Sequence, residues 1–418
     1  MIIATTATCC IAALATAGVV IRPFQLPEAV WAVAAAALLV VSGLLSWSDA
    51  LAGIGKGTDV YLFLTGMMLI AEMARQEGLF DWLAALAVRQ AKGSPRRLFA
   101  LVYGVGIVVT ALMSNDATAV VLTPAVFAAA VAAGAEPLPF LLACAFIANA
   151  ASFVLPISNP ANLVIYGRAM PQLSAWLAQF GLASVVSIVM TYVILRLTQR
   201  RPLAATTLVA SVAQPRLGRG GVLIGTGIFA IALVLLVCSA LDVQLGFPTF
   251  ICAALVAAVA RLVSRSPLLP VLRQMAWSVL PLVAGLFVVV EGLQRVGIVG
   301  ALSTLIHTTV AHSVAAAAWL STAVIALACN LMNNLPVGLM TGSVLAGHPL
   351  PPQVSAAALI SVDLGPNLSV TGSLATILWL IALRREGVAL SAWRFLRLGL
   401  VVMPPALILS IAVVMLTT

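Results

Sequence analysis

The sequence predicts an all-α polytopic membrane protein made of two inverted-topology repeats. Of its 418 residues, 63% are hydrophobic and only 8% are charged, and the mean hydropathy is +1.17. A soluble domain of this size does not have so apolar a composition. A spanning helix needs about 20 apolar residues, and apolar segments of that length follow one another along nearly the whole chain. A pair of polar interruptions, in the same order, occurs once in each half.

Apolar runs bounded by Pro, Gly or charged clusters define the elements of the first repeat, residues 1–197. In order, we expect three spanning helices, an amphipathic interfacial helix, a re-entrant helical hairpin, a broken helix and a last spanning helix. Their ranges are 3–21, 28–46, 58–76, 79–92, 96–133, 138–170 and 174–197. We expect the broken helix to be interrupted at Pro156 and Pro160 and to resume from Ala161 to Ile165.

The second repeat, residues 220–418, follows the only long polar connection, residues 198–219, which we predict to be a cytoplasmic linker. Its elements come in the same order as those of the first repeat. Their ranges are 221–240, 248–264, 277–290, an interfacial stretch at 298–310, a hairpin at 313–346, a broken helix at 353–382 and a last helix at 393–416. Each repeat therefore holds about five spanning helices and one hairpin. Periodicity leaves open whether each hairpin re-enters or spans fully.

An odd number of crossings in each repeat makes the repeats opposite in orientation, as in many secondary transporters. Most Lys and Arg residues lie in four connections, between residues 75–97, 196–219, 261–273 and 384–397. The positive-inside rule places these connections in the cytoplasm of a prokaryotic inner membrane, with both termini outside. The net charge of +9 thus reflects topology and does not indicate a nucleic-acid partner.

The strongest functional signal is Ser114–Asn115–Asp116 at the tip of the first hairpin. A charge at the bilayer centre costs at least ~2.5–3.5 kcal/mol, so such a residue usually faces a cavity or a partner. The second hairpin carries Asn333–Asn334 at its tip, and each broken helix has its own polar interruption. We interpret these four breaks as one binding site at the bilayer midplane, to which each repeat contributes two breaks.

Helix ends at the breaks leave backbone N–H and C=O groups that must face protein or water. The neutral side chains at the breaks suit a small polar solute. An anionic substrate would favour Lys or Arg at the site, and the sequence has neither at a break. The candidate substrate- and proton-coupling residues are Ser114, Asn115, Asp116, Asn149, Ser158, Asn159, Asn162, Asn333, Asn334, Asp363, Thr371, Gly372 and Ser373.

Asp116 and Asp363 are the only acids at the breaks. A carboxyl group removed from water can exchange a proton in the working pH range, so these residues are candidates for proton coupling or for binding a cation. The structural alternative is that each caps a broken helix, since Asp is favoured at an N-cap. This alternative carries more weight for Asp363, whose neighbours are Leu, Gly and Pro.

Other classes of chemistry find no support in the sequence. The six cysteines show no CxxC pattern and no nearby His, which favours buried packing thiols over a metal site. P-loop, GxSxG, HExxH and dinucleotide motifs are absent from the sequence. We therefore predict a transporter and not an enzyme, with no cofactor or metal and no ATP hydrolysis by this chain. The sequence carries no signal for an oligomeric state.

Four strings resemble the arsenite permease family, the arsenical pump membrane proteins of the ion transporter superfamily. They are SNDATAVVLTP (114–124), FIANAASFVLPISNPANLV (146–164), MNNLP (332–336) and DLGPNLSVTGSLATILWL (363–380). The resemblance implies two inverted repeats and efflux of arsenite and antimonite, as neutral As(OH)₃ and Sb(OH)₃, in exchange for protons. Members of that family can also work with a soluble ATPase subunit, which is a candidate partner.

One position departs from the resemblance. Many bacterial members have Asp where this chain has Asn149, so a proton carrier expected there is missing. Either Asp116 and Asp363 suffice, or the coupling differs. The alternative functions are a sodium/proton antiporter or a dicarboxylate carrier of the same superfamily. A passive channel is a further alternative, and only a flux measurement against a gradient separates it from a carrier.

Overall fold

The computed structural model describes residues 2–167, 170–205, 208, 215–347 and 350–418. All regular structure in these residues is helical, as the sequence predicts. In the first half the helices are α1 (Ile2–Ile21), α2 (Glu28–Val41), α3 (Trp47–Lys56), α4 (Thr58–Gln76), α5 (Leu79–Ala91), α6 (Pro95–Leu112), α7 (Asn115–Ala117), α8 (Thr123–Ala132), α9 (Leu138–Ala150), α10 (Pro160–Tyr166), α11 (Leu173–Thr198) and α12 (Arg200–Ala205).

The second half holds α13 (Arg219–Ala240), α14 (Gly246–Ser264), α15 (Leu269–Gln274), α16 (Val279–Arg295), α17 (Ile298–His312), α18 (Val314–Met332), α19 (Asn334–Gly347), α20 (Pro352–Leu364), α21 (Leu374–Arg385) and α22 (Ala392–Thr417). Short 3₁₀ turns at Pro23–Gln25, Pro156–Ser158 and Gly365–Leu368, and a π-helical turn at Thr118–Leu122, complete the assignment. The turns at Pro156 and Gly365 lie inside the two broken helices.

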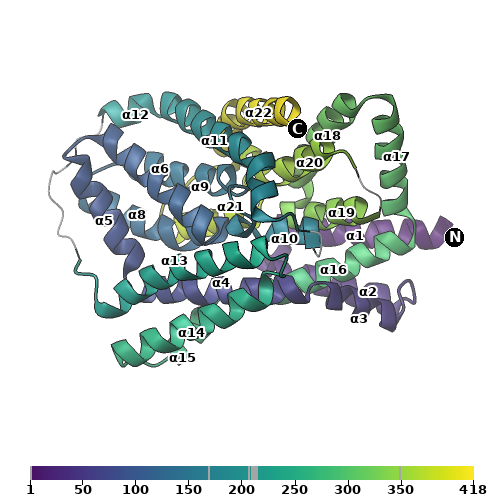
Figure 1. The fold of residues 1–418 in the computed structure, drawn as a ribbon, viewed down its shortest axis with the longest axis horizontal. Helices are drawn as coiled ribbons and strands as arrows, with labels where there is room; N and C mark the ends of the chain where they lie inside the picture. Colours follow the sequence, from purple (N-terminus) through teal and green to yellow (C-terminus); the bar gives the residue numbers. More distant parts are fainter. Residues whose placement is uncertain (1, 168–169, 206–207, 209–214, 348–349) are drawn as a thin grey trace.

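Seven of the described helices are long and apolar enough to cross a membrane, or up to nine if each of two bent helix pairs counts as one span. The bent pairs are α3 with α4, at 48°, and α16 with α17, at 70°. Figure 1 shows the first hairpin, α6 with α8, at one end of the molecule and the second, α18 with α19, towards the other. The broken helices α9–α10 and α20–α21 lie between the hairpins and contact each other.

The helices of the two halves correspond in order. The helix that precedes each hairpin is α5 in the first half and α17 in the second. Each of these two helices begins directly after a glycine with positive φ, Gly78 and Gly297 respectively. Each glycine stands six residues after a buried glutamate, Glu72 or Glu291. The boundaries of the two repeats, 1–197 and 220–418, remain predictions, because element order alone does not fix them.

Two expected connections differ in the structure. The stretch before Thr58, expected as a connection, forms helix α3, which begins at a side-chain cap: Ser46 Oγ accepts a hydrogen bond from Asp49 N (3.1 Å). The predicted linker 198–219 begins with helix α12. Residues 206–207 and 209–214 of that linker, and residues 168–169 of the first broken helix, lie outside the described residues.

Candidate functional site

The N-termini of four helices meet at one small cavity in the middle of the molecule. The central cavity, as we call it, is lined by the first residues of α7, α10, α19 and α21 together with one residue each from α4 and α16. Its lining is Leu64, Asn115, Asp116, Asn159, Pro160, Val279, Asn334, Leu335, Leu374 and Ala375. Residues at, or directly after, each of the four predicted breaks therefore line one cavity, although they lie up to 260 residues apart in the sequence, counted from Asn115 to Ala375.

A polar side chain caps each of these four helix starts. In every case its oxygen accepts a hydrogen bond from a backbone N–H two or three residues further on, which fixes the direction of the helix. The bonds run from Ala117 N to Ser114 Oγ (3.2 Å), Ala161 N to Asn159 Oδ1 (3.0 Å), Leu335 N to Asn333 Oδ1 (3.2 Å) and Thr376 N to Ser373 Oγ (3.0 Å). Caps satisfy only part of each terminus, so the four ends still direct partial positive charge towards the cavity.

Asn115 and Asn334 hold the same place in the two hairpins, immediately after the capping residue. Each is only 2% exposed, and both line the central cavity. The amide oxygens of both side chains have no hydrogen-bond partner among the described residues. A buried acceptor without a partner is costly, so these two oxygens are available to hydrogen-bond donors of a bound solute.

Asp116 lines the central cavity and also a second cavity beside it. It is the second residue of α7, where a negative charge interacts favourably with the helix N-terminus. Among the ion pairs of the described residues, none involves Asp116. Its carboxyl group therefore lies at a helix N-terminus and has no basic ion-pair partner among the described residues.

Asp363 has a different environment. It is fully buried, it is not part of the lining of the central cavity, and its Oδ1 accepts a hydrogen bond from Asn159 Nδ2 (2.7 Å). The last turn of α20 thus holds the residue that caps α10 in the other half. Its second oxygen, Oδ2, has no partner among the described residues.

Asn149 makes the reciprocal connection. At the end of α9, its Nδ2 donates to Asn367 Oδ1 (3.0 Å) and to Thr376 Oγ1 (3.2 Å), and Thr376 lies in the first turn of α21. The end of α9 is therefore hydrogen-bonded to the start of α21, and the end of α20 is hydrogen-bonded to the start of α10. The place of Asn149 corresponds to that of Asp363, so one connection is neutral and the other contains an acid.

The other predicted residues shape the breaks without lining the central cavity. Ser158 Oγ donates to Ala111 O (3.1 Å), and Asn162 Nδ2 donates to Ser152 O (3.0 Å). Thr371 Oγ1 donates to Asn330 O (3.0 Å). At Gly372 a Cβ atom would lie 2.6 Å from Pro366 Cα, so this glycine allows close packing of the loop.

Two larger cavities lie on either side of the central one, along α4 and α16. The first, the wide cavity, has a volume of about 630 Å³ and includes Thr58–Val60 of α4 and Phe287–Gln294 of α16. The second, the narrow cavity, has about 100 Å³ and includes Leu64–Glu72 of α4 and Val279 of α16. Because these two helices line all three cavities in succession, the cavities form a series along the helix axes. The central cavity, with about 10 Å³ open to the centre of a water molecule, holds about one water.

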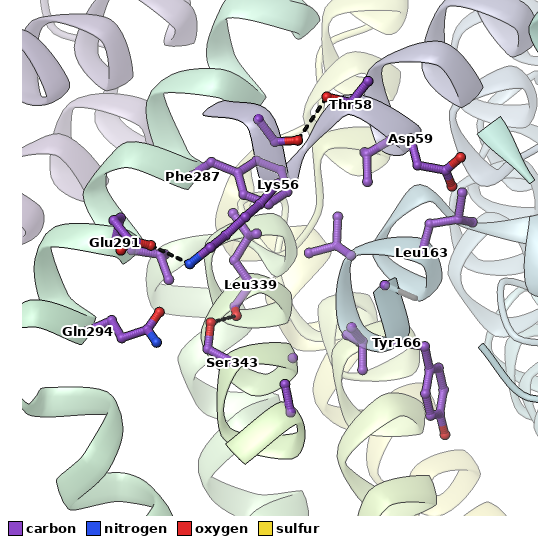
Figure 2. A pocket seen from close by; sticks show the side chains of 18 of the residues that line it. Lys56, Thr58, Asp59, Leu163, Tyr166, Phe287, Glu291, Gln294, Leu339 and Ser343 are labelled. Carbon is purple, nitrogen blue, oxygen red and sulfur yellow. Dashed lines mark hydrogen bonds and ion pairs between the residues drawn. The ribbon is translucent and has the colours of Figure 1, made fainter. Parts of the chain in front are cut away.

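The wide cavity contains charged side chains, as Figure 2 shows. Lys56, at the end of α3, points across it towards Glu291 of α16, and the Nζ–Oε2 distance is 2.6 Å. At the corresponding place in the other half, Glu72 lines the narrow cavity and pairs with Arg75 (2.6 Å). A buried glutamate of corresponding position thus lines the cavity on each side of the central site.

Several of these residues were not identified from the sequence. Leu64 and Val279 are apolar residues of spanning helices, and nothing in their type marks them as part of a site. Asn330 offered a signal, because an amide within the apolar run of α18 is costly in lipid; its Nδ2 donates to Gly365 O (2.9 Å) and its Oδ1 accepts from Ser369 (2.7 Å).

The family model for a citrate transporter matches residues 12–363, most of the chain. The chain belongs to this citrate transporter family. An arsenical pump membrane protein of Escherichia coli K12 is 29% identical to the chain over 362 residues, covering 83% of both chains. The one from Yersinia enterocolitica is 28% identical over 389 residues, covering 90% of both. The resemblance to arsenical pump membrane proteins is confirmed.

Two further matches concern an uncharacterized transporter and a solved structure. An uncharacterized transporter of Mycobacterium tuberculosis is 28% identical over 392 residues, 91% of both chains. Among solved structures, the YdaH transporter of Alcanivorax borkumensis superposes with a TM-score of 0.57 at 16% identity, over 88% of this chain and 87% of that one. This likeness concerns the fold alone. The chain is therefore a multi-span membrane transporter of the citrate transporter and arsenical pump kind, and the predicted all-helical membrane fold is confirmed.

Proposed function

We propose that the chain exports arsenite and antimonite across the bacterial inner membrane, as neutral As(OH)₃ and Sb(OH)₃, in exchange for protons. The observation that carries this proposal is the composition of the central cavity: four helix N-termini and two unpartnered amide oxygens surround it, and no Lys or Arg of the described part of the chain lines it. A trihydroxy solute offers both O–H donors and oxygen acceptors, so it matches such a lining without a net charge. The names of the relatives supply the element, arsenic.

Proton exchange is assigned to Asp116. It lies at the junction of the central and narrow cavities, where a carboxyl group meets the solute site and a path towards one face of the membrane. A protonated Asp116 would lower the negative charge beside the site, and release of the proton would restore it. Asp363, held by Asn159, is proposed as a second, more structural acid that couples the two broken helices.

Alternating access is the proposed mechanism. In the predicted topology, with both termini outside, the wide cavity faces the outside and the narrow cavity faces the cytoplasm. Because the central cavity holds no more than about one water, solute entry requires one hairpin tip to move away from the opposite broken helix. Because the two halves have opposite orientations, exchanging their conformations would convert an inward-open form into an outward-open form.

A carboxylate carrier is the second candidate. Two observations favour it: the family model is that of a citrate transporter, and four helix N-termini attract anions. Against it stands Asp116, whose negative charge would lie within the same cavity as the substrate's. Neutralisation of Asp116 by a proton would be needed before each carboxylate could bind.

The experiment that tests the proposal is uptake into everted membrane vesicles from cells that express the chain. As(III), Sb(III) and citrate are offered separately, with an imposed pH gradient, with a sodium gradient and with neither. We expect accumulation of As(III) and Sb(III) only with the pH gradient. Accumulation of citrate alone would establish the carboxylate carrier, and sodium-dependent dissipation of the pH gradient without solute uptake would establish a sodium/proton antiporter.

The cysteines are expected to be dispensable for this transport. None of the six lines the wide, central or narrow cavity, and Cys144 and Cys329 are buried within the helix packing. A variant with all six replaced by Ala or Ser should accumulate As(III) within about twofold of wild type, which corresponds to less than about 0.5 kcal/mol. Cys329 is the informative single site, because its Sγ lies 4.0 Å from Val362 O, beside Asp363. Loss of uptake in Cys329→Ala with normal protein levels would place a thiol in the site.

A further inference from the structure

A cavity lined by three arginines lies away from the transport site. It has a volume of about 280 Å³, and Arg96 of α6, Arg196 of α11 and Arg200 of α12 line it. We call it the arginine cavity. Basic residues near the cytoplasmic ends of spanning helices are expected in any inner-membrane protein. What distinguishes these three is that they come from three different helices and line one cavity.

We propose that the arginine cavity binds the headgroup of an anionic phospholipid. None of the three arginines takes part in an ion pair with another described residue, so their charges are available to a ligand. Guanidinium groups bind phosphate oxygens through paired, charge-assisted hydrogen bonds. The cavity therefore has the chemistry of a phosphate site.

The apolar part of the lining identifies a lipid, rather than a free ion, as the occupant. Val193 and Leu197 of α11 line the cavity and are 40% and 58% exposed. Both lie in the apolar run of a spanning helix that ends at Thr198. Acyl chains attached to a phosphate in the cavity would run along these side chains in the hydrocarbon region of the bilayer, a contact that a free phosphate ion cannot make.

Contacts within the protein position the wall of the cavity. The ring of Tyr192 lies 5.9 Å from that of Phe99 and 5.2 Å from that of Tyr103, so it joins α11 to α6. Arg196 donates a hydrogen bond from Nη1 to Tyr192 Oη (3.4 Å) and lies over the Tyr192 ring. Preorganisation of this kind reduces the entropy cost of binding. Because α6 is an arm of the first hairpin, a bound headgroup would fasten the base of that hairpin to α11.

The test uses the purified full-length protein in a nonionic detergent. Its thermal unfolding midpoint is followed as phosphatidylglycerol, phosphatidylcholine or inorganic phosphate is added. We expect saturable stabilisation by phosphatidylglycerol alone. In a variant with Arg96→Gln, Arg196→Gln and Arg200→Gln, the half-saturating concentration should rise about hundredfold, equivalent to about 1 kcal/mol for each arginine. All three side chains are exposed, so the folded state should persist.

The matched control carries Arg89→Gln, Arg265→Gln and Arg394→Gln, three exposed arginines outside the cavity. It loses the same net charge, and its half-saturating concentration should stay within about threefold of wild type. An equal loss in both variants would show general surface attraction and overturn the proposal. Equal stabilisation of wild type by phosphatidylcholine, or full stabilisation by inorganic phosphate, would also overturn it, and neither comparison depends on a variant or on arsenite.

Discussion

Asp116→Asn is expected to reduce proton-driven accumulation of As(III) in everted vesicles to background. The substitution preserves the shape of the side chain and removes only its ability to ionise. Ser114, and not Asp116, accepts the capping hydrogen bond of α7, so the hairpin tip should keep its structure. The carboxyl group lines both the central and the narrow cavity and has no ion-pair partner among the described residues. Its charge is therefore the one that a transported proton would neutralise.

Two further measurements separate loss of coupling from loss of the site. The variant should still exchange As(III) for As(III) across the membrane at equilibrium, because that reaction needs no net proton movement. Asp81→Asn, which removes an exposed acid from α5 outside these cavities, should accumulate As(III) like wild type. Gradient-driven accumulation by Asp116→Asn at the wild-type level would remove Asp116 from the coupling mechanism.

Gly342→Ala is expected to have the second largest effect, on folding and transport together. Helices α10 and α19 pack against each other, and a Cβ atom at Gly342 would lie 2.7 Å from the carbonyl oxygens of both Val164 and Ile165. Backbone atoms cannot move aside as a flexible side chain can. The two helices must separate, and each carries a capped N-terminus of the central cavity. Overpacking of this kind costs about 1–3 kcal/mol.

The measurements for Gly342→Ala are the thermal unfolding midpoint in detergent and As(III) uptake at equal protein level. Gly104→Ala is the matched control, because Gly104 lies within helix α6 and, apart from the backbone of its own helix, no atom lies within 4 Å of the added Cβ. Alanine is the better helix former by up to about 1 kcal/mol, so the control should be at least as stable as wild type. Similar behaviour of the two variants would mean that α10 and α19 separate without consequence for the site.

Much of the fold follows from composition and spacing. Apolar runs of helical length can only be helices in lipid, because every backbone polar group must be satisfied within the segment. The predicted hairpins, 96–133 and 313–346, agree with α6 to α8 and α18 to α19 within a few residues. Helix α3 was not predicted, because its ten residues are too short and too mixed in polarity to stand out from a connection.

The candidate residues could be identified from the sequence for the same energetic reason, but the role of each residue could not be predicted. Polar side chains in apolar segments are costly, so Asn115, Asp116, Asn149 and Asp363 are conspicuous in the sequence. The sequence makes both Asp116 and Asp363 candidates for proton coupling and distinguishes them only by giving a capping role more weight for Asp363. In the structure Asp116 lines the central cavity, whereas Asp363 is fully buried against Asn159 from the other half.

The sequence by itself determined that this is a helical membrane protein, where its helices break, and which polar residues the breaks contain, because those properties depend on local hydrophobicity and on backbone satisfaction. The prediction that the four breaks meet also came from the sequence, but only the tertiary structure decided which residues line a common cavity. The four N-termini at the central cavity, the apolar walls from α4 and α16, and the three arginines of the arginine cavity come from helices distant in the chain. Their proximity is set by packing between helices, and local sequence carries no record of which partner each helix face will find.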